Sequence, residues 1–282
     1  MEQQVTYFGS SARYRIFTTV KYIVYALLCL NIYLFLQEEL LALEYTFTDG
    51  VEPGQLIQAF SATIDTAAWV VLLLMFELET SVLDDKKLHG AVRWLLHGLR
   101  FICYLAIFYS LEGYYAELVT LYDVTSMPGA SMCAFVDGNY SLLLDLDDYA
   151  PLDAVNCAAA GPEIYRIAGF DILADADTLR AAQWLAWVDV INAFAWVLVV
   201  VVLEVEVRLQ LRGSLSNRIM QANKVLKIVV YATLFVAAAY WGVAGDFLDF
   251  WDAVLWLFAF VFIELNVFEW QYETHHPAAA PA

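Results

Sequence analysis

The chain has 282 residues, of which 62% are hydrophobic and only 16% are charged, and its mean hydropathy is +0.62. A soluble globular domain is close to half apolar and a quarter charged, so an ordinary soluble enzyme is not expected. A disordered chain has few apolar and many charged residues, so disorder is excluded. The formal net charge of −18 at pH 7 excludes a generally basic nucleic-acid-binding protein. The composition therefore predicts a polytopic protein of the lipid bilayer.

Six stretches are long and apolar enough to form membrane-spanning helices, each of which needs about 20 residues to cross the hydrocarbon core. They cover residues 16–36, 57–76, 95–111, 181–203, 225–243 and 247–267. The first apolar run is too long for a cleavable signal peptide. The expected fold class is therefore an all-α integral membrane protein with six transmembrane helices.

Basic residues indicate how these segments are oriented. Twelve of the fourteen Lys and Arg flank or connect the segments on one side, namely Arg13, Arg15, Lys21, Lys86, Lys87, Arg93, Arg100, Arg208, Arg212, Arg218, Lys224 and Lys227. The positive-inside rule places this side in the cytoplasm, so we expect a multi-pass protein of the cell (inner) membrane with both termini cytoplasmic. The opposite side is acidic, since the loop 112–178 contains twelve Asp and Glu and one Arg.

The four cysteines fall into two pairs with different surroundings. Cys133 and Cys157 lie in the long outer loop, where the compartment permits disulfides, and we expect them to pair. Cys29 and Cys103 lie inside apolar segments, which predicts buried free thiols. The sequence shows no zinc spacing, nucleophile motif or cofactor motif, so no cofactor is expected, no metal is assigned and an enzyme is not indicated.

The even-numbered segments share one spaced pattern of polar and aromatic residues. Each has Asp or Asn, then Trp four residues later, Glu after eight more, and Glu or Asn after two more: Asp65, Trp69, Glu77 and Glu79; Asn192, Trp196, Glu204 and Glu206; Asp252, Trp256, Glu264 and Asn266. Each odd-numbered segment has a basic residue with Tyr four residues later, at Lys21, Arg100 and Lys227. This self-similarity predicts three tandem helical hairpins of the same orientation, arranged as a pseudo-threefold bundle.

The repeat also predicts the division of the chain. Hairpin 1 covers 1–94 with the cytoplasmic N-terminus and connection, and hairpin 2 covers 95–215 with the outer loop 112–178 and its disulfide. Hairpin 3 covers 216–273, and 274–282 is expected to be a flexible tail.

The repeated polar residues form the predicted ion or polar core, which consists of Asp65, Glu77, Glu79, Asn192, Glu204, Glu206, Asp252, Glu264 and Asn266. Charged groups inside a membrane are costly, so they usually pair with one another or line a wet path. Lys21, Arg100 and Lys227 begin their segments at the depth of the glutamates, and three salt bridges that lock the hairpins are one interpretation. A cation or proton site is the other interpretation, because these segments contain five glutamates of the pattern but only three of the basic residues.

Two classes of function follow from these interpretations. The first, which we favour, is a cation- or proton-handling channel or transporter in which the acidic outer loop concentrates small cations. In its core, Asp65 and Asp252 lie in the outer half of their segments, beyond the reach of the repeated basic residues. The second is a non-catalytic accessory or scaffold subunit of a larger membrane protein complex. For both we expect a homo-oligomer or other membrane subunits as partners, and an enzyme with its site in the loop 113–178 is the least supported alternative.

Overall fold

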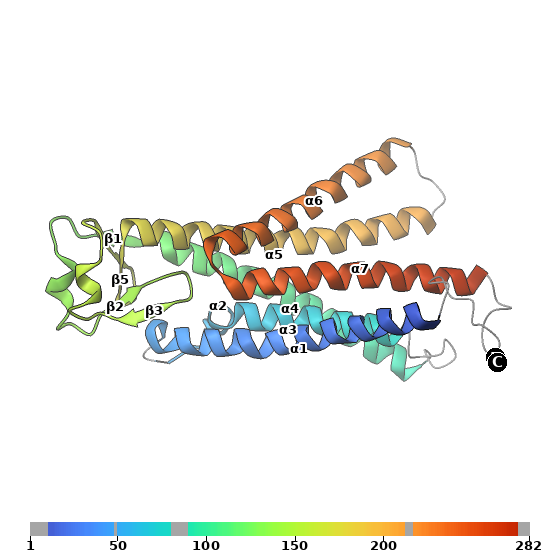
Figure 1. The fold of residues 1–282 in the computed structure, drawn as a ribbon, viewed down its shortest axis with the longest axis horizontal. Helices are drawn as coiled ribbons and strands as arrows, with labels where there is room; N and C mark the ends of the chain where they lie inside the picture. Colours follow the sequence, from blue (N-terminus) through green and yellow to red (C-terminus); the bar gives the residue numbers. More distant parts are fainter. Residues whose placement is uncertain (1–10, 48–49, 80–89, 212–216, 276–282) are drawn as a thin grey trace.

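The computed structural model describes residues 11–47, 50–79, 90–211 and 217–275, and it is mostly helical (Figure 1). The helices are α1 (Ser11–Thr46), α2 (Leu56–Ala59), α3 (Ser61–Glu77), α4 (Ala91–Tyr122), α5 (Ala176–Leu211), α6 (Asn217–Ala244) and α7 (Phe247–His275). The strands are β1 (Val124–Ser126), β2 (Ser141–Leu143), β3 (Tyr149–Pro151), β4 (Ile164–Ile167) and β5 (Ile172–Asp175). Two short 3-10 helices cover Met132–Phe135 and Asn156–Ala158.

Four stretches among the described residues are long and apolar enough to cross a membrane. They are Ala12–Thr46, Ala91–Tyr122, Ala176–Val202 and Gln221–Ala244, which coincide with four of the six predicted segments. With its 17 residues, α3 is at the lower limit of the lengths that cross a membrane, about 17–25 residues, and α7 carries Asp249 and Asp252 in its first two turns. A mostly helical chain that could span a membrane is thus confirmed.

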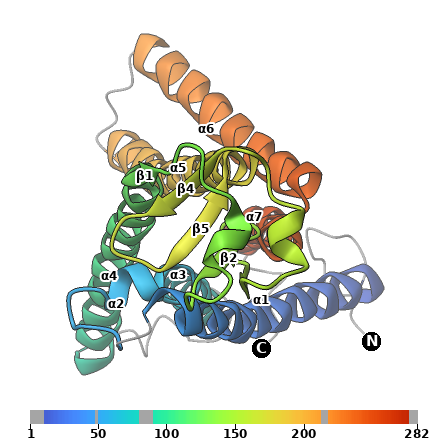
Figure 2. The same cartoon turned by 90° about the vertical axis from the view of Figure 1, so that its left-hand side faces the viewer.

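The long helices pack side by side in chain order. α1 contacts α3, α3 contacts α4, and the series continues through α5 and α6 to α7, which packs back against α1 and closes the ring. The end-on view shows α1, α4 and α6 as the three outermost helices, along the sides of a triangle (Figure 2). α1 begins and α7 ends at the same end of the bundle, opposite the β-strands (Figure 1). We call these two ends the sheet end and the far end.

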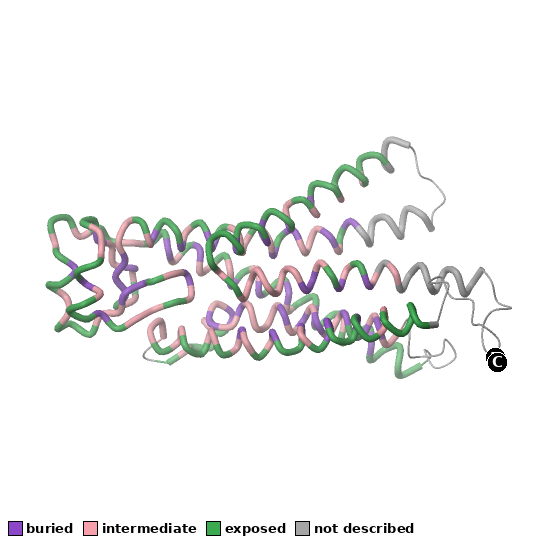
Figure 3. Tube along the Cα trace, viewed as in Figure 1, coloured by how far each residue is buried: buried purple, intermediate pink, exposed green. Residues whose placement is uncertain are grey.

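The outer faces of the helices are apolar. On α4, Phe101, Ile102 and Phe108 are more than half exposed, and exposed residues follow most of the described part of α6 (Figure 3). A monomeric soluble protein rarely exposes a continuous apolar surface of this extent. The lateral surface of the bundle is therefore suited to lipid.

The sequence analysis missed a small sheet, and the all-α prediction is wrong in this respect. Its strand order is β1-β4-β5-β2-β3, with β2 and β5 parallel and the other neighbours antiparallel. Alternate side chains point to opposite faces: Leu142 and Leu173 pack with the 3-10 helices, whereas Leu143 and Ile172 pack onto α4, α5 and α6. The sheet is thereby fixed over one end of the bundle by burial on both faces.

The predicted disulfide between Cys133 and Cys157 is confirmed, and the two Cα atoms are 4.9 Å apart. It links the first 3-10 helix to the second, on the side of the sheet that faces away from the bundle. Cys103 is a buried free thiol as expected, but Cys29 is exposed, because its side of α1 does not face the bundle core. The prediction of a buried Cys29 is therefore wrong.

Candidate functional site

A partly enclosed cavity of about 130 Å³ lies between the sheet and the bundle. Every one of the seven helices contributes to its wall, and the sheet unit adds residues that include Leu146, Asp147, Tyr149 and Ile172. The volume holds several water molecules. The cavity thus joins parts of the chain that are far apart in sequence.

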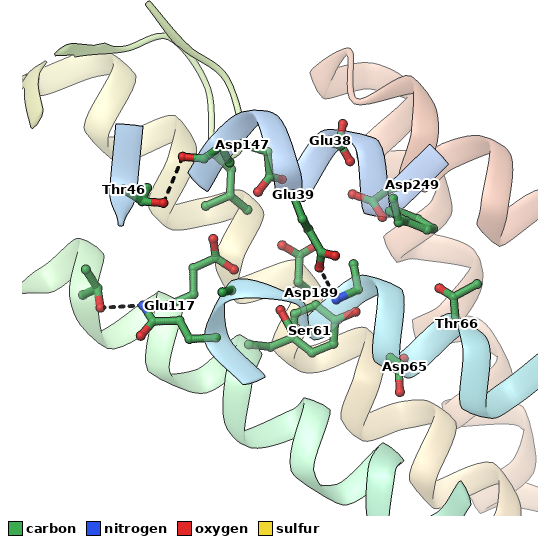
Figure 4. A pocket seen from close by; sticks show the side chains of 18 of the residues that line it. Glu38, Glu39, Thr46, Ser61, Asp65, Thr66, Glu117, Asp147, Asp189 and Asp249 are labelled. Carbon is green, nitrogen blue, oxygen red and sulfur yellow. Dashed lines mark hydrogen bonds between the residues drawn. The ribbon is translucent and has the colours of Figure 1, made fainter. Parts of the chain in front are cut away.

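The wall of this cavity is strongly acidic. Eight carboxylic acids line it: Glu38, Glu39, Asp65, Glu117, Asp147, Asp189, Asp249 and Asp252. Figure 4 shows Glu39, Glu117, Asp147 and Asp189 directed towards one another from different elements. Within the described chain, the wall includes no Lys, Arg or His. The carboxylates must therefore be neutralised by protons or by cations from solution.

Glu39 has one satisfied and one unsatisfied oxygen. Its Oε1 accepts hydrogen bonds from the backbone N–H groups of Ala62 (2.8 Å) and Thr63 (3.3 Å), in the first turn of α3. The free N–H groups and the helix dipole stabilise a negative charge at this point. Its Oε2 is buried without a hydrogen-bond partner in the described chain, although Glu39 lines the cavity. A ligand in the cavity would supply the missing donor or cation.

Other carboxylates of the wall are oriented by neutral donors. The indole Nε1 of Trp241 donates to Asp189 Oδ1 at 3.1 Å, and the fully buried Asn31 donates through Nδ2 to Asp252 Oδ1 at 2.7 Å. These donors fix the position of the carboxylates but do not cancel their charge. These carboxylates are therefore held in fixed positions in the wall.

The cavity ends at a cluster of three tryptophans. Trp69, Trp196 and Trp256 come from α3, α5 and α7, and their ring centroids are 6.0 to 6.5 Å apart in each pair. All three line the cavity. Trp69 and Trp256 also interact with Asp65 and Asp252, which lie one turn earlier on the same helices. Aromatic faces and carboxylates thus occur side by side at the floor.

Asp147 reaches the cavity from the loop between β2 and β3, outside the helices. Burial raises the pKa of its carboxyl well above the ordinary value, and the negative charges of Glu117 and Glu38 raise it further. Burial, with the charges of Glu117 and Asp147, likewise raises the pKa of Tyr149, whose hydroxyl donates to the Leu146 carbonyl at 3.1 Å. The sheet therefore places a carboxyl that favours the protonated form against the acids of the bundle.

The far half of the bundle contains compensated charges instead. Lys21 Nζ of α1 lies 2.6 Å from Glu77 Oε1 of α3, both side chains are almost fully buried, and the Tyr22 hydroxyl donates to the same oxygen at 3.0 Å. Glu79, on a different side of the chain, accepts a hydrogen bond of 2.8 Å from Arg100 of α4 in a more exposed pair. The two acids bind different neighbouring helices because they point in nearly opposite directions.

The structure separates the predicted core into two levels. Asp65, Asn192 and Asp252 line the cavity together, whereas Glu77 and Glu79 lie in the far half with Lys21 and Arg100. The side chains of Glu204, Glu206, Glu264 and Asn266 lie outside the described residues. Lys227 on α6 has interactions of its own.

Six of the acidic wall residues do not belong to the predicted polar core. Glu117 and Asp147 lie in the predicted outer loop 112–178, Glu38 and Glu39 follow the first predicted segment, and the proximity of these four residues depends on the tertiary structure. Asp189 and Asp249 carried a usable signal, because each lies three residues before Asn192 or Asp252 and hence on the same helix face. That spacing in two of the predicted segments could have identified them.

In comparisons with known proteins, no family model, curated protein or solved structure matches this chain. A function must therefore be argued from the cavity and the bundle.

Proposed function

We propose that this protein spans the membrane with six helices and binds small cations in the cavity beneath the sheet, as the first step of moving them across the membrane. The observation that carries this proposal is the wall of eight carboxylic acids with no basic side chain among its described residues. Such a wall repels anions and is stabilised by any cation that replaces the missing counter-charge.

The orientation that we propose follows from the charge distribution. The sheet would face the outside, and Lys21 and Arg100 in the far half would face the cytoplasm, in accordance with the positive-inside rule. Both described ends of the chain, at the start of α1 and the end of α7, lie at the far end (Figure 1). The disulfide at the sheet end supports an oxidising compartment on that side.

An apolar cluster separates the cavity from the far half. Leu28, Val70, Leu73, Ala259 and Phe262 are buried together, and Trp69 and Trp196 pack against them. A desolvated ion cannot cross such a cluster without a large free-energy cost. We therefore propose a gated mechanism, in which the helices carrying the three tryptophans must separate before a cation passes.

Cation binding and flux test this proposal directly. The full chain is purified in detergent, and thermal stability is measured with a panel of inorganic and organic cations at constant ionic strength; flux of the same cations is measured in reconstituted vesicles. Asp65→Asn and Asp252→Asn should each weaken binding by about tenfold or more, since each removes one favourable charge interaction. Asn192 already provides an amide at this level, so the variants should fold.

Asp137→Asn is the matched control, because Asp137 is exposed in the sheet unit and does not line the cavity. Binding and flux that depend on Asp65 and Asp252 but not on Asp137 would support the proposal. A wild-type protein that neither binds nor transports any cation of the panel would refute it. The two ion pairs at Glu77 and Glu79 favour the rival proposal of a scaffold subunit, to which that result would point.

A further inference from the structure

We propose that the cation bound in the cavity is an aliphatic di- or polyamine rather than a bare metal ion. This inference rests on the proposed function, because it specifies the guest of the same cavity.

The carboxylates are numerous but are not arranged as a metal site. A bare Ca²⁺ ion takes six to eight oxygen ligands at about 2.3–2.6 Å, and Mg²⁺ requires near-octahedral geometry at shorter distances. No group of three or more Asp, Glu, His or Cys in the described part of the chain is close enough together to hold a metal ion. The eight acids instead surround a space of about 130 Å³, which suits a larger guest with several charges.

The floor of the cavity has the composition of an ammonium site. Trp69, Trp196 and Trp256 line the cavity there and pack on one another in tilted or edge-to-face pairs, and Asp65 and Asp252 lie one turn before two of them. Tryptophan is the best aromatic partner for an ammonium ion, and cages of aromatic rings are a recurrent means of recognising one. One ammonium group of the guest would therefore lie against the indoles, between these two aspartates.

A second acidic level lies closer to the sheet. On α7, Asp249 precedes Trp256 by seven residues, which corresponds to about 10 Å along the helix axis. Glu39, with its unpartnered and buried Oε2, and Asp147 belong to the wall at this end. The indoles at the floor and this acidic level are thus about 10 Å apart along the helix axis, a distance that ammonium groups joined by methylene chains can span.

Apolar side chains in the wall of the cavity fit the methylene groups of such a guest. Phe35, Ala42, Leu43, Leu146 and Ala253 line the cavity together with the acids. A hydrated inorganic cation gains nothing from these surfaces, whereas an alkyl chain buries apolar area against them. The combination of carboxylates, indoles and aliphatic groups is therefore specific to an amine with an alkyl chain.

The test is calorimetric titration of the detergent-purified full chain with putrescine and spermidine, and separately with Na⁺, K⁺, Mg²⁺ and Ca²⁺. We expect saturable binding of both amines that excess Na⁺ or K⁺ weakens only modestly. Trp256→Leu should weaken spermidine binding about tenfold and Trp256→Phe a few-fold, because the ring face is removed or reduced. Trp184→Phe, at an exposed tryptophan outside the cavity, is the matched control and should leave binding unchanged.

The phenylalanine variant keeps the inference testable if the leucine variant does not fold. Binding of inorganic cations without binding of amines would overturn the inference and leave the proposed function standing. Amine binding that is equally strong in Trp256→Phe, Asp252→Asn and wild type would overturn the assignment of this guest to this cavity. The absence of binding by any cation would overturn both proposals.

Discussion

Replacing Lys21 by Met tests whether the buried ion pair with Glu77 stabilises the bundle. The two side chains are only 4% and 6% exposed, and Nζ and Oε1 are 2.6 Å apart. The variant has similar volume but removes the Lys21 ammonium from the buried Glu77 carboxylate, and breaking a buried pair on one side typically costs about 3–5 kcal/mol. Because the Tyr22 hydroxyl still donates to Glu77, we expect a loss near 3 kcal/mol in the free energy of unfolding. Denaturant titration in mixed micelles, followed by tryptophan fluorescence, measures this loss.

Two comparisons make this prediction specific. Arg100→Met breaks the pair with Glu79. The side chains of Arg100 and Glu79 are 32% and 25% exposed, so this variant should lose less than about 1 kcal/mol in the free energy of unfolding. The double variant Lys21→Met, Glu77→Gln should recover most of the loss, since it removes the buried negative charge together with its Lys21 partner. A loss for Lys21→Met no larger than that for Arg100→Met, or a double variant with additive losses, would refute the reasoning.

Three further predictions concern other parts of the chain. Because the pKa of Asp147 is raised, its contribution to stability is complete below the ordinary value of 3.8 and is lost as pH rises through the raised value. Asp147→Asn should therefore raise the melting temperature of the cation-free protein at pH 7–8 and have little effect near pH 3. An unchanged melting temperature at pH 8 would contradict this prediction. Gly113→Ala should destabilise the protein by about 1–3 kcal/mol in thermal melts, because the new Cβ would lie 2.6 Å from the Ile57 carbonyl oxygen. The control Gly98→Ala, whose new Cβ has nothing within 4 Å, should be neutral or slightly stabilising in the same thermal melts. Reduction of Cys133–Cys157 should lower the stability of the sheet unit by about 3 kcal/mol, and equal melting curves with and without reductant would show that the disulfide does not stabilise the fold.

The sheet shows which part of the fold could not be predicted from composition and periodicity. Its strands are three or four residues long, and their pairs join residues as distant as Val124 and Ile167. Short segments with β-branched and aromatic residues, such as Ile164–Ile167, and Ile-containing segments such as Ile172–Asp175, are typical of strands between turns, yet each is too short for a reliable period. Only the pairing of distant segments, driven by burial against the bundle, makes them a sheet.

Local sequence by itself determined the mostly helical class, four of the apolar helices that could span a membrane, the disulfide, and the shared helix face of each Asp or Asn and the Trp that follows. These properties depend on residue type and on a helical repeat of 3.6, which a single segment already contains. The tertiary structure alone decided that Glu39 of α1 and Asp147 of the β2–β3 loop lie in one cavity with Asp65, while Glu77 pairs with Lys21. Which charges are compensated depends on which helices become neighbours in the ring, and that is decided by the packing of all the helices together.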